Sequence, residues 1–220
     1  MKSERDAFVN GGEELSEESI YGEYRGNLEK ILENIVGRIR DYTDETYEQT
    51  GTKLHEHLIA RVKSDESMRE KCRRRGLPET PYSALHELTD SIGIRIICSF
   101  IDDVYENVRR IKAFPNLSVV LEKDYIRHAK PNGYRSYHMI IKVEAPFEDV
   151  AGNTPGEYFV ELQLRTIAMD SWASLEHKMK YKKNIPNSDI IVAELKRCAD
   201  ELAACDVSMQ TIRDLINYSS

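Results

Sequence analysis

The stretch Gly93–Phe100 (GIRIICSF) constrains the fold of this chain more than any other segment. It is short, apolar and rich in β-branched residues, which predicts a buried central strand. Such a strand needs other strands beside it and helices over it, because its backbone and its side chains must both be shielded from water. The chain must therefore build a covered sheet around this segment.

The remaining sequence supplies the partners that this strand needs. Alternating or β-branched patterns predict further strands at Lys53–Lys63, Leu117–Leu121, Ser136–Val143 and Tyr158–Arg165. Three- and four-residue apolar spacing, with capping and breaking residues, predicts helices over Ile20–Arg40, Ser64–Gly76, Ala84–Asp90, Asp102–Ala113, Ile167–Tyr181 and Ser188–Ile216, with a break at Asn184–Asn187. The order predicts an α+β fold with a mixed, mostly antiparallel five-stranded sheet flanked by helices.

Composition excludes several classes of protein. The 220 residues are 40% hydrophobic and 31% charged, which is typical of a globular chain and not of a disordered one. No apolar run approaches the roughly 20 residues of a membrane span, so we expect no membrane association. The net charge of −7 argues against a dedicated duplex-DNA binder. Four cysteines without a C-x-x-C pair are typical of reduced thiols in the cytoplasm.

The strand Tyr158–Arg165 is the first place where chemistry concentrates. Alternation puts Glu161, Gln163 and Arg165 on one face, where three long polar groups are costly to bury without a task. Asp90 precedes the central strand, and together with Glu161 it can hold one Mg²⁺, which prefers one or two carboxylates plus phosphate oxygens. The alternatives are the solvated face of an edge strand for Glu161 and a local turn bond for Asp90.

Two basic segments complement these acids. The segment Arg61–Arg75 crowds cations around a predicted helix start, which suits a polyphosphate, although a solvated cationic helix face is the alternative. The segment Lys123–His138 mixes basic residues with tyrosines around Pro-Asn-Gly, which suits phosphates and a stacked base. Its alternative is a hairpin entry whose tyrosines pack on the sheet. Asp170 can accept the paired N–H donors of a guanine edge or be an ordinary first-turn acid.

Five motifs together resemble one family. They are RVKS (Arg61–Ser64), TDSIGIRIIC (Thr89–Cys98), PNGYRSYH (Pro131–His138), VELQLRT (Val160–Thr166) and SWASLEHKMKYK (Ser171–Lys182). In this order they resemble the synthetase domain of RelA/SpoT-type alarmone synthetases. The resemblance implies a nucleotidyltransferase-like fold and transfer of pyrophosphate from ATP to the 3′-hydroxyl of GDP or GTP, giving ppGpp or pppGpp and AMP.

The resemblance also implies roles for individual residues. Asp90 and Glu161 would be the catalytic acids and the ligands of Mg²⁺. The residues implied to bind ATP are Arg61, Lys63, Ser67, Lys71, Arg74 and Arg95. The residues implied to bind GTP or GDP are Lys123, Lys130, Tyr134, His138, Gln163 and Asp170, with Tyr134 stacking on guanine.

Length narrows the subclass, because too few residues precede the motifs for a hydrolase domain. Phe100–Asp103 (FIDD) also resembles synthetase-only enzymes. We therefore expect a stand-alone small synthetase with a polar segment and flanking helix at 1–50, a catalytic domain at 51–183 and a C-terminal helix at 184–220. By resemblance the flanking helices would build a homotetramer. A partner RNA or an alarmone effector stays open.

Two other functions compete with synthesis. One is a catalytically silent module of the same fold that binds a nucleotide or RNA, which would predict damage at Asp90 or Glu161, and both are present. The other is an ordinary nucleotidyltransferase that releases pyrophosphate, which usually carries a Gly-Ser followed by paired Asp residues that this sequence lacks.

Overall fold

A computed structural model describes residues 19–180 and 188–218 of the chain. Its centre is a five-stranded sheet with the strand order β1-β2-β5-β4-β3. The strands are β1 (His57–Val62), β2 (Ile92–Cys98), β3 (Leu117–Asp124), β4 (Tyr137–Ala145) and β5 (Gly156–Thr166). Within the described residues, β2 and β5 run parallel and the other neighbouring pairs run antiparallel. The predicted mixed, mostly antiparallel sheet in an α+β fold is confirmed.

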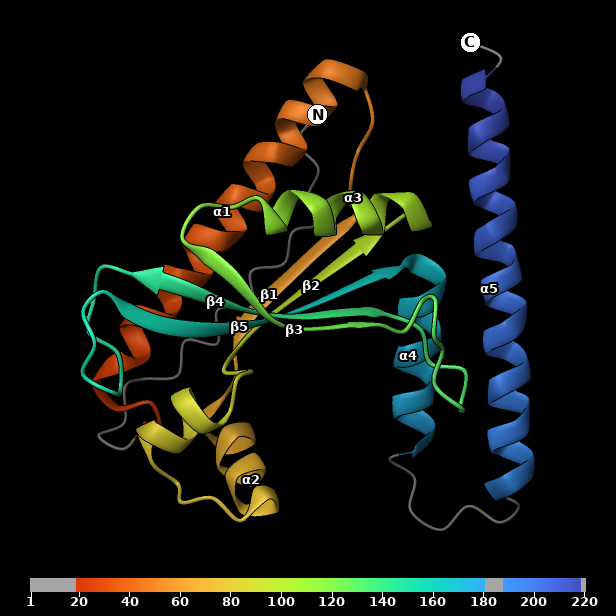
Figure 1. Ribbon diagram of the computed structural model, residues 1–220. Helices are drawn as coiled ribbons and strands as arrows, with labels where there is room; N and C mark the ends of the chain where they lie inside the picture. Colours follow the sequence, from red (N-terminus) through yellow and green to blue (C-terminus); the bar gives the residue numbers. More distant parts are fainter. Residues whose placement is uncertain (1–18, 181–187, 219–220) are drawn as a thin grey trace.

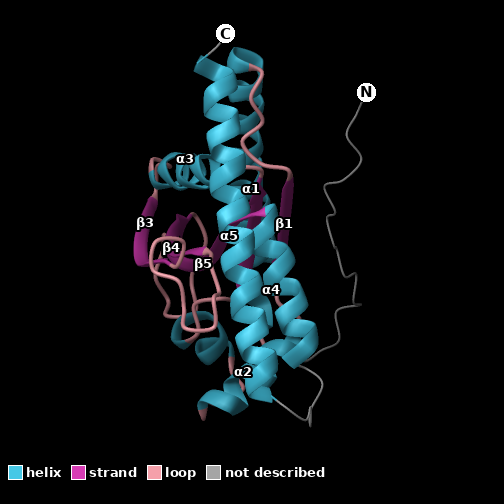
Figure 2. Cartoon of the chain, turned by 90° about the vertical axis from the view of Figure 1, so that its right-hand side faces the viewer, coloured by secondary structure: helices cyan, strands magenta, loops and turns pink. Residues whose placement is uncertain are grey.

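Helices cover the two faces of this sheet unequally. They are α1 (Arg25–Thr50), α2 (Asp65–Arg75), α3 (Ile101–Lys112), α4 (Ile167–Lys180) and α5 (Ser188–Tyr218), with a short 3₁₀ turn at Gly22–Tyr24 and a π-helical turn at Ser83–Glu87. Figure 1 shows α1 and α3 on one side of the sheet and α2 on the other side. Helices α4 and α5 stand side by side at one end of the sheet (Figures 1 and 2).

The covered face holds the core. Alternate residues of β2, β5 and β4, such as Ile94, Leu162 and Met139, are at most 2% exposed and belong to one cluster with the apolar stripe of α1. Because side chains alternate across a strand, the residues between them face the side that α1 and α3 leave open. The sheet thus has one apolar face, which packs into the core, and one polar face, which can contact a ligand.

Helix α1 differs from the sequence expectation at both ends. It begins at Arg25 after the 3₁₀ turn and continues to Thr50 rather than ending near Arg40. The extension follows from burial, because Tyr42, Thr43 and Thr46 keep the three- and four-residue spacing on the core side. The helix stops at Gly51, whose φ of 69° gives the left-handed conformation of a C-terminal cap.

Smaller differences concern three other boundaries. The strand expected over Lys53–Lys63 is confined to β1, and the strand expected over Leu117–Leu121 continues along its partner β4 to Asp124. The short helix expected at Ala84–Asp90 is a π-helical turn that ends at Glu87, so Asp90 lies in the connection before β2. The spacing of apolar residues predicts that a helix or strand exists better than it predicts where it ends. The ends depend on pairing and capping with segments elsewhere in the chain.

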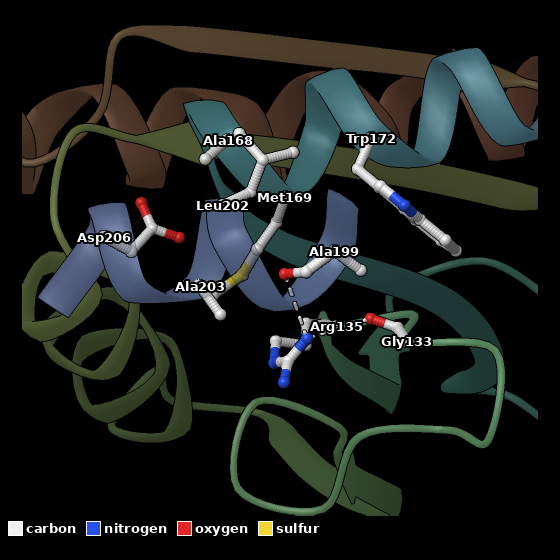
Figure 3. A pocket seen from close by; sticks show the side chains of 9 residues that line it. All are labelled: Gly133, Arg135, Ala168, Met169, Trp172, Ala199, Leu202, Ala203 and Asp206. Carbon is white, nitrogen blue, oxygen red and sulfur yellow. Dashed lines mark hydrogen bonds between the residues drawn. The ribbon is translucent and has the colours of Figure 1, made fainter. Parts of the chain in front are cut away.

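Helix α5 packs against α4 and against the loop before β4. Trp172 Nε1 donates a hydrogen bond to the carbonyl of Leu195, at 2.8 Å. Gly133 has a φ of 89°, and a Cβ there would lie 2.6 Å from the Cβ of Ala199, so no other residue fits at this contact. Figure 3 shows Arg135 reaching the carbonyl of Ala199. The loop that carries Tyr134 is therefore held by the C-terminal helix.

Some expectations concern residues that the structure does not describe. The polar segment up to residue 18 and the break at Asn184–Asn187 lie outside the described residues. The proposed division at 51, 183 and 184 stays a prediction. Among the described helices, none is long and apolar enough to cross a bilayer.

Candidate functional site

The polar face of the sheet carries one continuous row of predicted site residues. Strand pairing sets Arg95 of β2 beside Gln163 of β5, and Gln163 beside His138 of β4. His138 in turn lies beside Lys123 of β3. Residues paired in this way lie on the same face of a sheet, so segments far apart in sequence meet in one line.

The neighbouring row opens the floor of the site. Arg61 of β1 pairs with Gly93 of β2, and Gly93 pairs with Glu161 of β5. A Cβ at Gly93 would meet nothing within 4 Å, so the space between Arg61 and Glu161 is empty. A glycine near the start of β2 therefore exposes backbone to a ligand on this face.

These rows form a cleft of about 390 Å³. Its lining residues come from β1 and its end, β2 and β5: Ile59, Ala60, Arg61, Lys63, Gly93, Ile94, Arg95, Glu161 and Gln163. Five of the predicted site residues thus share one cavity, with Glu161 as the carboxylate among them. The volume is in the range of small-molecule sites.

Lys63 lines the cleft at the side of α2, and Asp90 and Lys71 lie directly behind it; we call these three residues the α2 end. Asp90 Oδ2 accepts hydrogen bonds from the ammonium groups of both Lys63 and Lys71. Burial favours a higher pKa for Asp90, but the hydrogen bonds and charges of the two lysines outweigh it and lower the pKa. The other carboxylate oxygen, Oδ1, is buried without a partner in the described part of the chain. Asp90 is thus a charged carboxylate whose Oδ1 can still accept a ligand.

Helix α2 presents the remaining predicted ATP ligands outside the cleft lining. Ser64 caps the helix, because its Oγ accepts the backbone N–H of Ser67 at 3.4 Å. Ser67 and Arg74 are exposed, whereas Arg73 is paired with Glu79 at 3.0 Å. The helix start and Arg74 therefore face solvent next to the α2 end. Neither Ser67 nor Arg74 is among the residues that line the described cleft.

Arg165 is the centre of the opposite end, which we call the Tyr134 end. It is 6% exposed and donates from Nη2 to Tyr134 Oη at 2.8 Å and to Gln163 Oε1 at 3.0 Å. Its Nη1 donates to Asp170 Oδ1 at 2.9 Å, and its Nε donates to Ser136 Oγ at 3.3 Å. One buried guanidinium thus contacts three of the residues predicted to bind guanosine.

His138 stays neutral in this surrounding. Its Nε2 lies 2.7 Å from Tyr134 Oη, and its Nδ1 lies 4.0 Å from Glu161 Oε1. Burial, helped by the positive charges of Arg165, Lys130 and Lys123, lowers the pKa of His138 to about 4. A neutral imidazole can position a neighbouring group without competing as a cation for the Glu161 carboxylate.

Asp170 is held by two arginines of the sheet. It lies in the first turn of α4, and its Oδ1 contacts Arg165 Nη1 at 2.9 Å and Arg95 Nη1 at 3.4 Å. Both arginines come from the polar face of the sheet, and Arg95 is one of the residues predicted to bind ATP. Asp170 therefore connects a predicted ATP ligand with the buried Arg165. Burial and the nearby Arg165 lower the pKa of Arg95, and the Asp170 carboxylate opposes that shift.

The two predicted lysines of the Tyr134 end are exposed. Lys130 Nζ lies 4.6 Å from the ring centroid of Tyr125 and 4.8 Å from that of Tyr134, a cation–π arrangement on the loop before β4. Lys123 projects from β3 beside His138. Both lysines can reach a negatively charged ligand over the polar face.

Sequence reasoning missed the role of Arg165 and of Ser136. Alternation along β5 placed Arg165 on the polar face, but it gave no reason to prefer it over Glu161 or Gln163. The missing information was the approach of Tyr134 and of α4, which the fold alone provides. A buried arginine at a strand end, followed after five residues by an acid in a first helical turn, is the signal that was available.

The residues present fit a divalent cation held together with substrate phosphates. In the described part of the chain, no group of three or more His, Cys, Asp and Glu side chains converges on one point. Mg²⁺ does not need such a group, since it often takes one or two carboxylates and completes its shell with water and phosphate. The unpartnered Oδ1 of Asp90 and the Glu161 carboxylate of the cleft would supply two such ligands.

Comparison with curated proteins finds two bacterial relatives. The chain is 43% identical over 159 residues to the GTP pyrophosphokinase YwaC of Bacillus subtilis, covering 72% of this chain and 73% of that protein. It is 36% identical over 195 residues to the GTP pyrophosphokinase YjbM of the same organism, covering 86% and 85%.

Comparison with solved structures finds proteins of the same kind. The small alarmone synthetase 1 from Bacillus subtilis bound to its product pppGpp superposes with a TM-score of 0.68 at 32% identity, covering 88% of this chain and 94% of that one. The same synthetase bound to AMPCPP gives a TM-score of 0.63 at 28% identity, covering 88% and 93%. Residues 60–186 match the family model described as the region found in RelA / SpoT proteins, and the chain belongs to this family.

Proposed function

We propose that this chain makes alarmones by moving the β,γ-pyrophosphate of ATP to the 3′-hydroxyl of GDP or GTP, with release of AMP. The observation that carries this proposal is the position of Glu161, which lies in one cleft between a cationic α2 end and an aromatic Tyr134 end. Its support from relatives is the pair of GTP pyrophosphokinases that match most of the chain.

In this proposal the α2 end binds the donor. Arg61 and Arg95 flank the open floor at Gly93, where a flat adenine can lie between guanidinium groups. Lys63 and Lys71, which hold Asp90 in the free protein, turn toward the triphosphate when it arrives, and the exposed Arg74 adds charge from α2. Cations of this kind absorb the charge that develops on the leaving AMP.

The Tyr134 end binds the acceptor. Tyr134 offers a ring for stacking on guanine. Gln163 and Asp170 lie close to it, because Arg165 donates hydrogen bonds to all three side chains. Lys123, Lys130 and His138 surround the place where acceptor phosphates would lie. This arrangement puts the sugar of the acceptor toward Glu161.

Glu161 then takes the proton of the 3′-hydroxyl. The new bond forms between that oxygen and the β-phosphorus of ATP, and the bond from the β-phosphorus to the α,β-bridging oxygen breaks. A positioned carboxylate base contributes on the order of 10²–10⁴-fold, and in-line placement contributes the rest. Asp90 and Glu161 would hold Mg²⁺, which when bound neutralises phosphate charge.

A labelled-transfer assay tests the proposal against its two alternatives. The protein is incubated with ATP labelled in the β-phosphate, GDP and Mg²⁺, and the products are separated. Label in a guanosine tetraphosphate supports the proposal. Label only in free pyrophosphate would favour an ordinary nucleotidyltransferase, and no turnover would favour a silent binding module.

The assembly part of the proposal rests on α5. The apolar stripe of α1 is buried in the core, so α1 leaves little apolar surface for a partner. The second half of α5 instead exposes Val207, Ile212, Leu215 and Ile216 by more than half. We assign the predicted homotetramer contact to this face. Light scattering behind size exclusion tests it, with a monomeric mass as the contrary result. A cytoplasmic location stays a prediction.

A further inference from the structure

Arg165 is not among the site residues predicted from the sequence. Its side chain is 7% exposed, and it lies where β5 ends and α4 begins. A buried guanidinium is costly unless its donors and its charge are matched. Here four of its five N–H groups have acceptors, and one acceptor is the carboxylate of Asp170.

The directions of these hydrogen bonds determine what the Tyr134 end presents to a ligand. Since Tyr134 Oη accepts from Arg165, its own hydrogen is free to point at His138 Nε2, 2.7 Å away. Both contacts restrain the phenol, and the Arg165 guanidinium lies 5.4 Å from the ring centroid. The ring plane is therefore set before any base arrives.

Arg165 also fixes the orientation of Gln163 and Asp170. Gln163 Oε1 accepts from Arg165, which turns its amide NH₂ away from the guanidinium as a donor. Asp170 Oδ1 accepts from Arg165, which leaves Oδ2 as the acceptor. A guanine edge offers one acceptor, O6, beside two donors, N1–H and N2–H₂. It therefore matches one fixed donor and one fixed acceptor. An adenine lying in the same orientation presents the reverse pattern, a donor at N6 and an acceptor at N1, and does not match.

Lysine could not replace this arrangement. The guanidinium spreads its donors over a planar fork, so one group reaches Tyr134, Gln163, Asp170 and Ser136 at once, at 2.8–3.3 Å. An ammonium has three donors on one nitrogen and cannot hold four acceptors in those positions.

We infer that Arg165 is the positioning residue of the acceptor base, and that it sets the preference for guanine by fixing Tyr134, Gln163 and Asp170. It touches no reacting atom. The inference rests on the proposed function, because it takes the Tyr134 end as the site of the guanosine substrate.

The main test compares Arg165→Lys with the unchanged protein in the labelled-transfer assay. We expect the KM for GDP to rise by about tenfold or more, since at least two hydrogen-bond restraints are lost, while the KM for ATP changes by less than about twofold. We also expect the ratio of kcat/KM for GDP to that for IDP, which lacks the N2 amine, to fall toward one.

Two controls separate positioning from general damage. Arg110→Lys changes a half-buried arginine of α3 that pairs with Glu106, and it should leave both KM values unchanged. If Arg165→Lys does not fold, Tyr134→Phe removes the hydroxyl that Arg165 holds while keeping the ring. That variant should raise the KM for GDP by about three- to tenfold and leave the KM for ATP unchanged.

The outcomes also distinguish this inference from the proposed function. If the unchanged protein fails to label a guanosine product, the proposed function fails first. If it does label that product, but Arg165→Lys keeps the KM for GDP within about twofold or raises both KM values equally, the inference is wrong. An unchanged ratio between GDP and IDP would also overturn it.

Discussion

The α2 end and the Tyr134 end of the cleft both gather positive charge, but they hold it in different ways. At the α2 end, Lys63 and Lys71 share a single oxygen of Asp90, and Arg74 is exposed on the surface of α2. At the Tyr134 end, Arg165 is buried and hydrogen-bonded to four side chains that come from β5, α4 and the loop before β4.

The difference matches the two kinds of ligand. A flexible polyphosphate is held by charge, and charges on mobile lysines can move with it. A purine base is recognised by a plane and a pattern of donors, which must be fixed in advance if binding is not to cost much ordering entropy. The comparison therefore predicts that variants at the two ends affect different kinetic parameters.

The largest effect is expected at Glu161, which serves both ends. Glu161→Gln keeps the size of the side chain and removes the charge, so transfer should fall by about 10³-fold or more while the melting temperature changes little. Glu157→Gln, an exposed acid of the same strand that pairs with Lys142, is the matched control and should stay active. Normal turnover in Glu161→Gln would remove this residue from the mechanism.

Asp90→Asn tests the α2 end. The substitution leaves Lys63 and Lys71 without their shared carboxylate and removes the negative charge of one of the two side chains offered to Mg²⁺. We expect kcat/KM for ATP to fall by roughly 10²-fold, in the range that the loss of a metal-binding or charge-stabilising group produces. Isothermal titration of Mg²⁺ with a non-hydrolysable ATP analogue should show weaker binding. An unchanged titration would assign the metal elsewhere.

Tyr134→Ala tests the Tyr134 end. Loss of a stacking ring costs about 1–3 kcal/mol per base, so the KM for GDP or GTP should rise by roughly tenfold or more. The KM for ATP should stay within about twofold, because the ring partners of Tyr134 in the described part of the chain are Tyr125, His138 and Trp172, away from the α2 end. A rise of both constants together would contradict the separation of the two ends.

Arg74→Ala should have a smaller effect, and on the KM for ATP rather than on that for GDP. An exposed cation contributes weakly and is screened by salt, so we expect the KM for ATP to rise about two- to fivefold at low ionic strength and less at high salt. Arg75→Ala, its exposed neighbour on α2, is the control. Equal effects of the two substitutions would indicate a general field of α2 rather than a contact of Arg74.

The smallest effect concerns stability against pH. His138 has its ordinary pKa of 6.5 lowered to about 4, so between these values the unfolded chain binds a proton that the folded chain does not. Stability should therefore fall as the pH drops from 6.5 toward 4, and His138→Gln should remove this part of the slope. Urea unfolding at several pH values measures it. Parallel curves for the two proteins would show that the imidazole titrates normally.

Much of the site could be predicted because its residues follow simple periods. Alternation in β5 placed Glu161 and Gln163 on one face, and both line the cleft. The order of strands and helices gave the α+β class. The end of α1 and the extent of β3 could not be predicted, because burial of Thr46 and pairing with β4 depend on partners elsewhere in the chain.

The amino-acid sequence by itself determined the family, the sheet and the types of side chain at the site, since each is encoded in local spacing and in motifs. Only the tertiary structure decided that Arg165 joins Tyr134, Gln163 and Asp170, and that Asp90 holds two lysines. The physical reason is distance along the chain. Residues 134, 165 and 170 meet through strand register and the placement of α4, and no local pattern records those contacts.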